Sequence, residues 1–137
     1  MANAGYSGTP LPQKLGIKEA HKVAILGAPP AFALGVLPPG VTVKRNLVGK
    51  TPLDVLVVFV TKRVDLVNRI TTCRPRMQPA AGLWIAWPKR ASGVATDITE
   101  DTIRELALPT GLVDNKVCAI DETWSGLRLV IRKELRG

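Results

Sequence analysis

Residues 87–92 combine side chains that together can bind a small charged molecule. Trp87 offers an aromatic face and Ser92 offers a hydroxyl, and between them Lys89 and Arg90 supply two cations. This mixture can hold a phosphate, a carboxylate or a stacked base. The segment follows an apolar stretch typical of a buried strand, and open α/β sheets bind ligands at the carboxyl ends of their strands. The alternative is an ordinary solvated loop.

A second polar segment, residues 121–126, joins the last two predicted strands. Its polar and aromatic side chains are Asp121, Glu122, Trp124 and Ser125. If the strand before it runs parallel to the others, this turn emerges at the same edge as residues 87–92, and we expect the two segments to touch. Trp87 and Trp124 would then flank one cleft. The neighbouring acidic and basic pairs could instead form surface ion pairs, which contribute little to stability.

Two further segments occupy positions that bind ligands in nucleotide-binding sheets. Gly27 and Pro29 belong to a Gly-Ala-Pro-Pro turn after the first predicted strand, where such folds place their ligand loop. Each proline removes an amide donor, so the alternative is a tight structural turn. Lys44 and Arg45 end the second predicted strand, where an acid normally binds a ribose. Basic residues there suit a phosphate, or alternatively protect an edge strand from pairing.

Acid–base and metal chemistry have few candidate residues in this chain. The sequence has one histidine, His21, and two cysteines, Cys73 and Cys118. These numbers exclude a zinc site built from histidines or from four cysteines, and they make a Ser-His or Cys-His pair improbable. We therefore expect no catalytic residue and no metal site. The identity of any cofactor is not readable from the sequence.

Strands and helices alternate along the chain. We predict strands at residues 22–26, 41–45, 54–60, 83–87, 115–120 and 127–132, with a turn at 79–82. We predict helices at 10–16, at 31–34, after Thr61 and before Pro109. The expected caps are Thr9, Thr61, and either Asp97 or Thr99. Val64, Val67 and Ile70 should form the inner face of the third helix.

This order predicts a three-layer, Rossmann-like α/β domain. Its open sheet should have about six strands, mostly parallel, and should end in an antiparallel hairpin. Residues 1–137 form one domain by the usual size range, and the small, polar residues 1–8 are expected to be loosely held.

Composition limits the class of protein further. Nineteen Lys and Arg residues against eleven Asp and Glu give a net charge of +8. A basic excess favours anionic partners such as a small molecule, nucleic acid or an acidic protein, or serves solubility alone. No apolar stretch is long enough to span a bilayer, and the amino terminus does not resemble a signal peptide. We therefore expect a cytoplasmic protein without a membrane partner, and its oligomeric state is not predicted.

Several segments resemble known families. HKVAILGAPPAFA, DVLVVFVT and MQPAAGLWIAW, together with the hairpin KVCAIDETWSGLRLVIRK, resemble a shortened class I S-adenosylmethionine-dependent methyltransferase fold. YSGTPLPQKLGI, WPKRASGVATDITE and VCAIDETWSGLRLV are similar to a family of short bacterial proteins known only as a domain of unknown function. The methyltransferase resemblance implies the fold. The changed ligand loop, the missing ribose-binding acid and the missing methyl-acceptor elements count against the activity.

These observations predict a non-catalytic or degenerate domain whose cleft suits an anionic or nucleotide-like small molecule. The alternatives are a protein-binding scaffold or regulatory module, a nucleic-acid-associated protein and, least favoured, an active methyltransferase.

Overall fold

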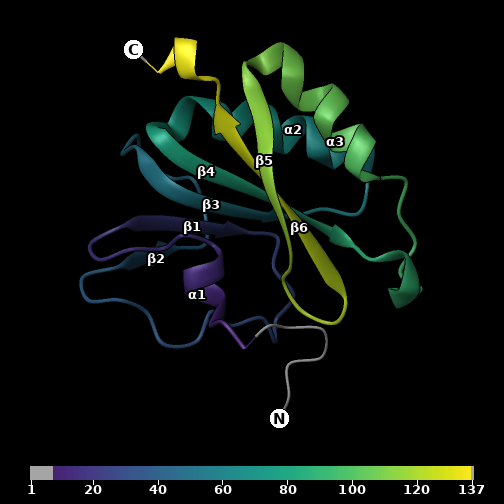
Figure 1. The fold of residues 1–137 in the computed structure, drawn as a ribbon, viewed down its shortest axis with the longest axis horizontal. Coiled ribbons are helices and arrows are strands. Elements are labelled where there is room, and N and C mark those ends of the chain that lie inside the picture. Colours follow the sequence, from purple (N-terminus) through teal and green to yellow (C-terminus); the bar gives the residue numbers. More distant parts are fainter. Residues whose placement is uncertain (1–7, 137) are drawn as a thin grey trace.

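The computed structural model describes residues 8–136 (Figure 1). The expectation of a loosely held amino terminus therefore lies outside the described residues, except for Gly8. A single six-stranded sheet runs through the molecule in the order β2-β1-β3-β4-β6-β5. The strands are β1 (Lys22–Leu26), β2 (Thr42–Lys44), β3 (Leu53–Phe59), β4 (Met77–Pro88), β5 (Leu112–Ala119) and β6 (Trp124–Ile131). Strands β1 to β4 are parallel, and β6 is antiparallel to both β4 and β5.

Helices cover one face of the sheet, and a short helix with irregular chain covers the other (Figure 1). The α-helices are α1 (Leu11–Lys14), α2 (Arg63–Cys73) and α3 (Glu100–Ala107). Four 3-10 turns lie at η1 (Arg74–Arg76), η2 (Arg90–Ser92), η3 (Leu108–Thr110) and η4 (Lys133–Leu135). The mixed α/β sheet with an antiparallel carboxyl-terminal pair confirms the predicted fold class. No helix of the described chain is long and apolar enough to cross a membrane.

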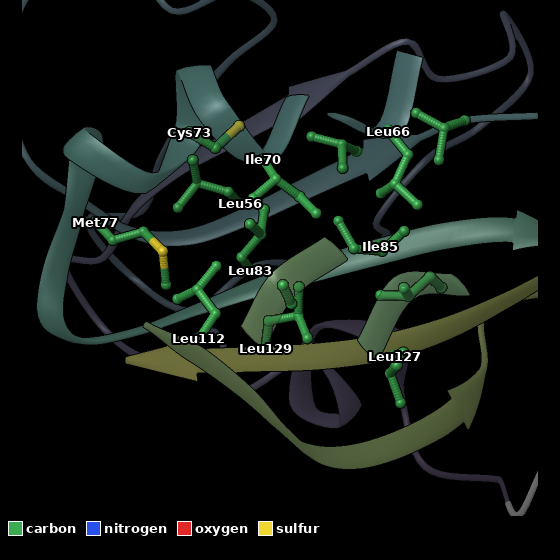
Figure 2. Close-up of a cluster of buried hydrophobic side chains, with 14 of the residues drawn as sticks. Leu56, Leu66, Ile70, Cys73, Met77, Leu83, Ile85, Leu112, Leu127 and Leu129 are labelled. Atoms are coloured by element: carbon green, nitrogen blue, oxygen red, sulfur yellow. The ribbon is translucent and has the colours of Figure 1, made fainter. Parts of the chain in front are cut away.

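The two faces of the sheet bury separate apolar clusters. Figure 2 shows the first, in which Leu66 and Ile70 of α2 pack on strand residues such as Leu56 and Leu83. The second cluster lies under α1 and residues 27–41 and is centred on Trp84, which is fully buried. The Trp84 indole Nε1 donates to the Leu15 carbonyl oxygen at 3.0 Å. This bond joins the end of α1 to the middle of β4.

Two elements differ from the sequence prediction. Residues 31–34 form no helix: a turn follows Pro29, and Phe32 and Leu34 pack as irregular chain on the second apolar cluster. Residues 79–82 are not a turn, since β4 already begins at Met77. A register shift between Leu53 and Val55 accommodates Pro79, as expected for a proline inside a sheet.

The inner face of α2 also differs from the prediction. Leu66, Ile70 and Cys73 are buried, whereas Val64 is 70% and Val67 is 44% exposed. Apolar side chains occur on both sides of this helix in the sequence, so periodicity alone did not identify the face that packs. Ile70 is the one correctly placed residue of the predicted set.

Helix capping follows the alternative prediction for α3. Thr99 is the N-cap of α3 and forms a capping box with Thr102. Asp97 instead accepts a hydrogen bond from the Arg63 backbone N–H at 2.7 Å, at the start of α2. Neither Thr9 nor Thr61 is an N-cap, since Pro10 and Lys62 occupy those positions. The segment after β4 therefore supplies, through Asp97, a hydrogen-bond acceptor to the amino terminus of α2.

Candidate functional site

The carboxyl ends of β1 and β3 mark the point where the sheet order reverses. From β1 the chain moves to β2 on one side, and β3 lies on the other side of β1. Open α/β sheets bind ligands in the crevice outside such a point, because the two connections diverge there. The residues that end these strands are Leu26 with Gly27, and Phe59 with Val60.

Gly27 allows the chain to pass very close to β3. Its φ is +71°, and a Cβ atom placed on it would lie 2.9 Å from the Phe59 carbonyl oxygen. A side chain at position 27 would therefore meet both backbone strain and a backbone contact. Gly27 therefore has a structural role at this junction.

A polar cavity of about 460 Å³ opens beside this junction. It is lined by Phe59 and Val60 of the β3 end and by four side chains of α2: Asp65, Asn68, Arg69 and Thr72. Its volume lies in the range of small-molecule sites. The α2 residues repeat at helical spacing i, i+3, i+4, i+7, so they share one side of the helix.

Arg69 is the cation of this cavity. It is half-buried, and one of its terminal nitrogens lies 3.8 Å from where a Cβ of Gly27 would be. Among the described residues none forms an ion pair with Arg69. A guanidinium presents planar donors that match a carboxylate or a phosphate. The geometry therefore offers an anion one positive group beside the strand ends.

An aromatic row occupies the other face of the same edge. The Phe32 and Phe59 rings lie 4.8 Å apart, and the Phe59 and Trp124 rings lie 5.1 Å apart, both edge to face. The row links the segment after the Gly-Ala-Pro-Pro turn to β3 and β6. A smaller cavity of about 290 Å³ lies close by, between α1, residues 31–33 and Ile120 with Asp121.

The two segments singled out from the sequence do touch. The Lys89 backbone N–H donates to the Thr123 carbonyl oxygen at 2.8 Å, and Pro88 pairs with Trp124. This contact confirms the expectation that the turn at 121–126 emerges beside residues 87–92. It follows from β5 running parallel to β4, with β6 between them.

The expectation that Trp87 and Trp124 flank one cleft is wrong. Trp87 is buried in the cluster under α2 and α3, whereas Trp124 packs against the cluster on the opposite face. Trp87 pairs with Ser125, and Trp124 pairs with Pro88. Neighbouring residues of a strand point to opposite faces, so the indoles are separated by the sheet itself.

Several predicted site residues form the turns instead. The Asp121 Oδ1 accepts from the backbone N–H groups of Thr123 and Trp124, both at 2.8 Å. The Ser92 hydroxyl donates to the Lys89 carbonyl oxygen at 2.6 Å and accepts from the Val94 N–H. In the described chain, Asp121 and Glu122 form no ion pair with Lys89 or Arg90. Arg90 lines a separate cavity of about 490 Å³ beside Trp87 and the start of α3.

Lys44 and Arg45 end β2 at the same edge of the sheet as residues 87–92, because β2 and β4 run parallel. Strands β1 and β3 lie between them, so the two basic pairs are separated along that edge. The Lys44 ammonium donates to the Val48 carbonyl oxygen at 2.6 Å, and Arg45 is exposed. Arg76, beside the start of β4, donates to carbonyl oxygens of Leu47 and Thr51 and thereby holds residues 45–52.

Sequence reasoning did not select Asp65, Asn68, Arg69 or Thr72. Their signal was present as a polar stripe at helical spacing on the helix that follows the most apolar strand. The loops offer a stronger signal than a helix face does, because ligand-binding residues are common on loops. In the described chain no group of three or more His, Cys, Asp or Glu side chains is placed to hold a metal ion.

The fold is that of the Rossmann-like, S-adenosylmethionine-dependent methyltransferases. A methyltransferase from Aquifex aeolicus superposes with a TM-score of 0.61 at 14% identity, covering 87% of each chain. Fibrillarin from Aeropyrum pernix, solved with S-adenosyl-L-methionine bound, gives 0.58 at 15% identity over 92% of this chain and 70% of its own. Fibrillarin from Methanococcus jannaschii, a pre-rRNA processing protein, gives 0.61 at 13% identity over 90% and 69%. No family model and no curated protein matches the sequence.

Proposed function

We propose that this chain is a non-catalytic binding domain for a small anionic or nucleotide-like molecule, held in the cavity beside Arg69. The carrying observation is the half-buried, unpaired guanidinium at the carboxyl ends of β1 and β3. The location agrees with ligand sites in open α/β sheets. The surrounding amide, hydroxyl and carboxylate of α2 would orient the bound molecule by hydrogen bonds.

The residues present fit S-adenosylmethionine poorly. A ribose-binding acid is expected at the end of β2, where Lys44 is found bonded to the Val48 carbonyl oxygen. The turn after β1 has two prolines, each without an amide donor. His21, at the amino end of β1, accepts a hydrogen bond from the Lys18 N–H through its Nδ1. These features support binding without methyl transfer.

Thermal unfolding in the presence of candidate ligands tests the proposal. Suitable ligands are inorganic phosphate, AMP, ATP, S-adenosylmethionine and S-adenosylhomocysteine. A ligand at 100 times its Kd adds about 2.7 kcal/mol to the free energy of unfolding. Arg69→Gln should abolish the stabilisation, and Arg63→Gln, on the same helix but outside the cavity, should keep it. No response to any ligand, or an equal response in both variants, would refute the site.

Methyl transfer requires its own measurement. Incubation with S-adenosylmethionine carrying a labelled methyl group, together with protein, RNA and small-molecule acceptors, should give no transfer. Transfer of the label would overturn the non-catalytic part of the proposal and would leave the binding site in place.

We also propose that the chain belongs to the family of short bacterial proteins of unknown function and that it is cytoplasmic. The alternative function is a regulatory or scaffold role with a protein partner. Retention of defined proteins from a native lysate, with no effect of small ligands, would favour that alternative.

A further inference from the structure

The face of β5 and β6 opposite α2 and α3 carries a set of cations, of which Lys116 and Arg136 are exposed and Arg128 is half-buried. Lys116 on β5 is exposed and pairs directly with Arg128 on β6. Both lie on the Trp84 face of the sheet, because Arg128 also pairs with Trp84. Val130, two residues further along β6, is buried yet belongs to neither apolar cluster. This part of the face therefore lies outside the packed core.

Further positive groups continue this surface. Arg136, in the exposed carboxyl-terminal segment, donates through Nε to the Ile131 carbonyl oxygen. Burial, and then the nearby Arg136 guanidinium, lower the pKa of Arg128. Lys14 of α1 and Lys116 both lie near the Cys118 thiol. Burial raises the pKa of this thiol, and the positive charges of the two lysines oppose that rise without cancelling it. We call Lys14, Lys116, Arg128 and Arg136 the basic strip.

No described acidic residue neutralises Lys116, Arg128 or Arg136. Asp114 points to the opposite face, where it binds Arg104, and Glu134 lies near Arg132. Within the described chain, Lys116, Arg128 and Arg136 take part in no ion pair. Two like charges directly opposite each other on neighbouring strands destabilise a sheet. Arg128 donates a hydrogen bond to Asn115 Oδ1, and Arg136 donates one to the Ile131 carbonyl oxygen, but neither bond balances the charge, so an external anion is the simplest purpose of the arrangement.

We propose that the basic strip binds the sugar-phosphate backbone of nucleic acid. Two arginines suit phosphate, because the guanidinium fork matches its oxygens. Trp84 lies opposite Arg128 but is fully buried, and no aromatic side chain of the described residues is exposed, so the strip would hold the backbone without reading bases. A protein partner fits less well, because specific protein interfaces have an apolar centre. The large exposed apolar side chains next to these residues in the chain are Val117 and Leu135, and Val117 lies on the opposite face, where it pairs with Leu127. This surface is separate from the cavity beside Arg69.

Salt dependence of binding is the primary test. A fluorescent 20-base-pair duplex and a single-stranded RNA of mixed sequence serve as probes, and poly-glutamate serves as the competing polyanion. Contacts of Lys116, Arg128 and Arg136 with three phosphates predict a slope of about −2.7 for log K against log salt on duplex. This slope is roughly a 40-fold loss of affinity between 50 and 200 mM salt. Binding should be insensitive to sequence. No binding to either probe at 50 mM salt, or equal binding of poly-glutamate, would overturn the proposal.

Lys116→Glu separates binding from folding. A carboxylate at position 116 would face Arg128, so the variant should melt at a higher temperature than the parent protein. The same variant should bind duplex at least tenfold more weakly at 50 mM salt. Lower melting together with unchanged binding would refute the arrangement.

A charge-matched pair of variants tests the location. Lys116→Gln with Arg136→Gln should reduce the salt slope by about 1.8. The control, Lys18→Gln with Arg63→Gln, removes the same net charge from exposed residues elsewhere and should leave the slope unchanged. If both double variants lose binding equally, net charge and not the basic strip is responsible. Ligands of the Arg69 cavity should not compete with nucleic acid, so either proposal can fail alone.

Discussion

At the scale of single residues, the candidate site depends on one glycine. Gly27 has a positive φ and no space for a Cβ, since the Phe59 carbonyl oxygen lies 2.9 Å from that position. The close approach brings the loop after β1 against the end of β3, and Arg69 extends over the same junction. The sequence marked Gly27 as a turn residue. It could not reveal the neighbour, because Phe59 is 32 positions away.

We predict that Gly27→Ala lowers the free energy of unfolding by about 2–3 kcal/mol, from backbone strain and the displaced contact together. Gly35→Ala is the matched control, since Gly35 has φ +87° and nothing within 4 Å of its Cβ position. It should cost only about 1 kcal/mol. Urea unfolding of both variants gives the comparison. Equal losses would show that the approach to Phe59 contributes nothing.

At the scale of elements, the strands were the most predictable part. Strand β1 begins and ends where its sequence predicts, and β3 is displaced by one residue. Both are continuous runs of β-branched and apolar residues, which are typical of parallel strands buried on both faces. The helices were less predictable. The packing face of α2 depends on which side meets the sheet, and residues 31–34 pack as irregular chain on the second apolar cluster. The Arg69 cavity depends on the orientation of α2, which supplies four of its lining side chains, so the loops alone could not identify it.

The amino terminus of α2 gives an element-scale prediction. Asp97→Ala removes the acceptor of the Arg63 N–H and should lower the free energy of unfolding by about 1 kcal/mol. Asp97→Asn keeps a side-chain oxygen and should cost only a few tenths of that amount. Chemical denaturation of the three proteins distinguishes the cases. If asparagine is as harmful as alanine, the hydrogen bond is not the stabilising feature.

At the scale of the whole molecule, buried thiols connect stability to pH. Burial raises the pKa of Cys73 from 9.0 to about 11. The folded state therefore keeps its proton while the unfolded state releases it. The free energy of unfolding should be unaffected below about pH 9 and should then fall, by roughly 2–3 kcal/mol at pH 11.

Cys73→Ala is the control for this pH dependence. The substitution lowers stability at every pH, because it leaves a small cavity, but it should flatten the decline between pH 9 and 11 relative to the parent protein. Lysines titrate in the same range in both proteins, so the difference between the two curves isolates the thiol. Parallel curves would contradict the assignment.

The three tryptophans of the chain all lie along one strand pair. Trp84 and Trp87 belong to β4, and Trp124 begins β6. Strands β4 and β6 form the boundary between the parallel strands and the antiparallel hairpin. Intrinsic fluorescence of this protein therefore reports mainly the docking of the hairpin onto the parallel sheet. Through the Trp84 cluster, which contains Val23 and Ile25, it also senses β1. Agreement between fluorescence and circular dichroism during unfolding would then mean that the two parts of the sheet separate and unfold as one cooperative unit.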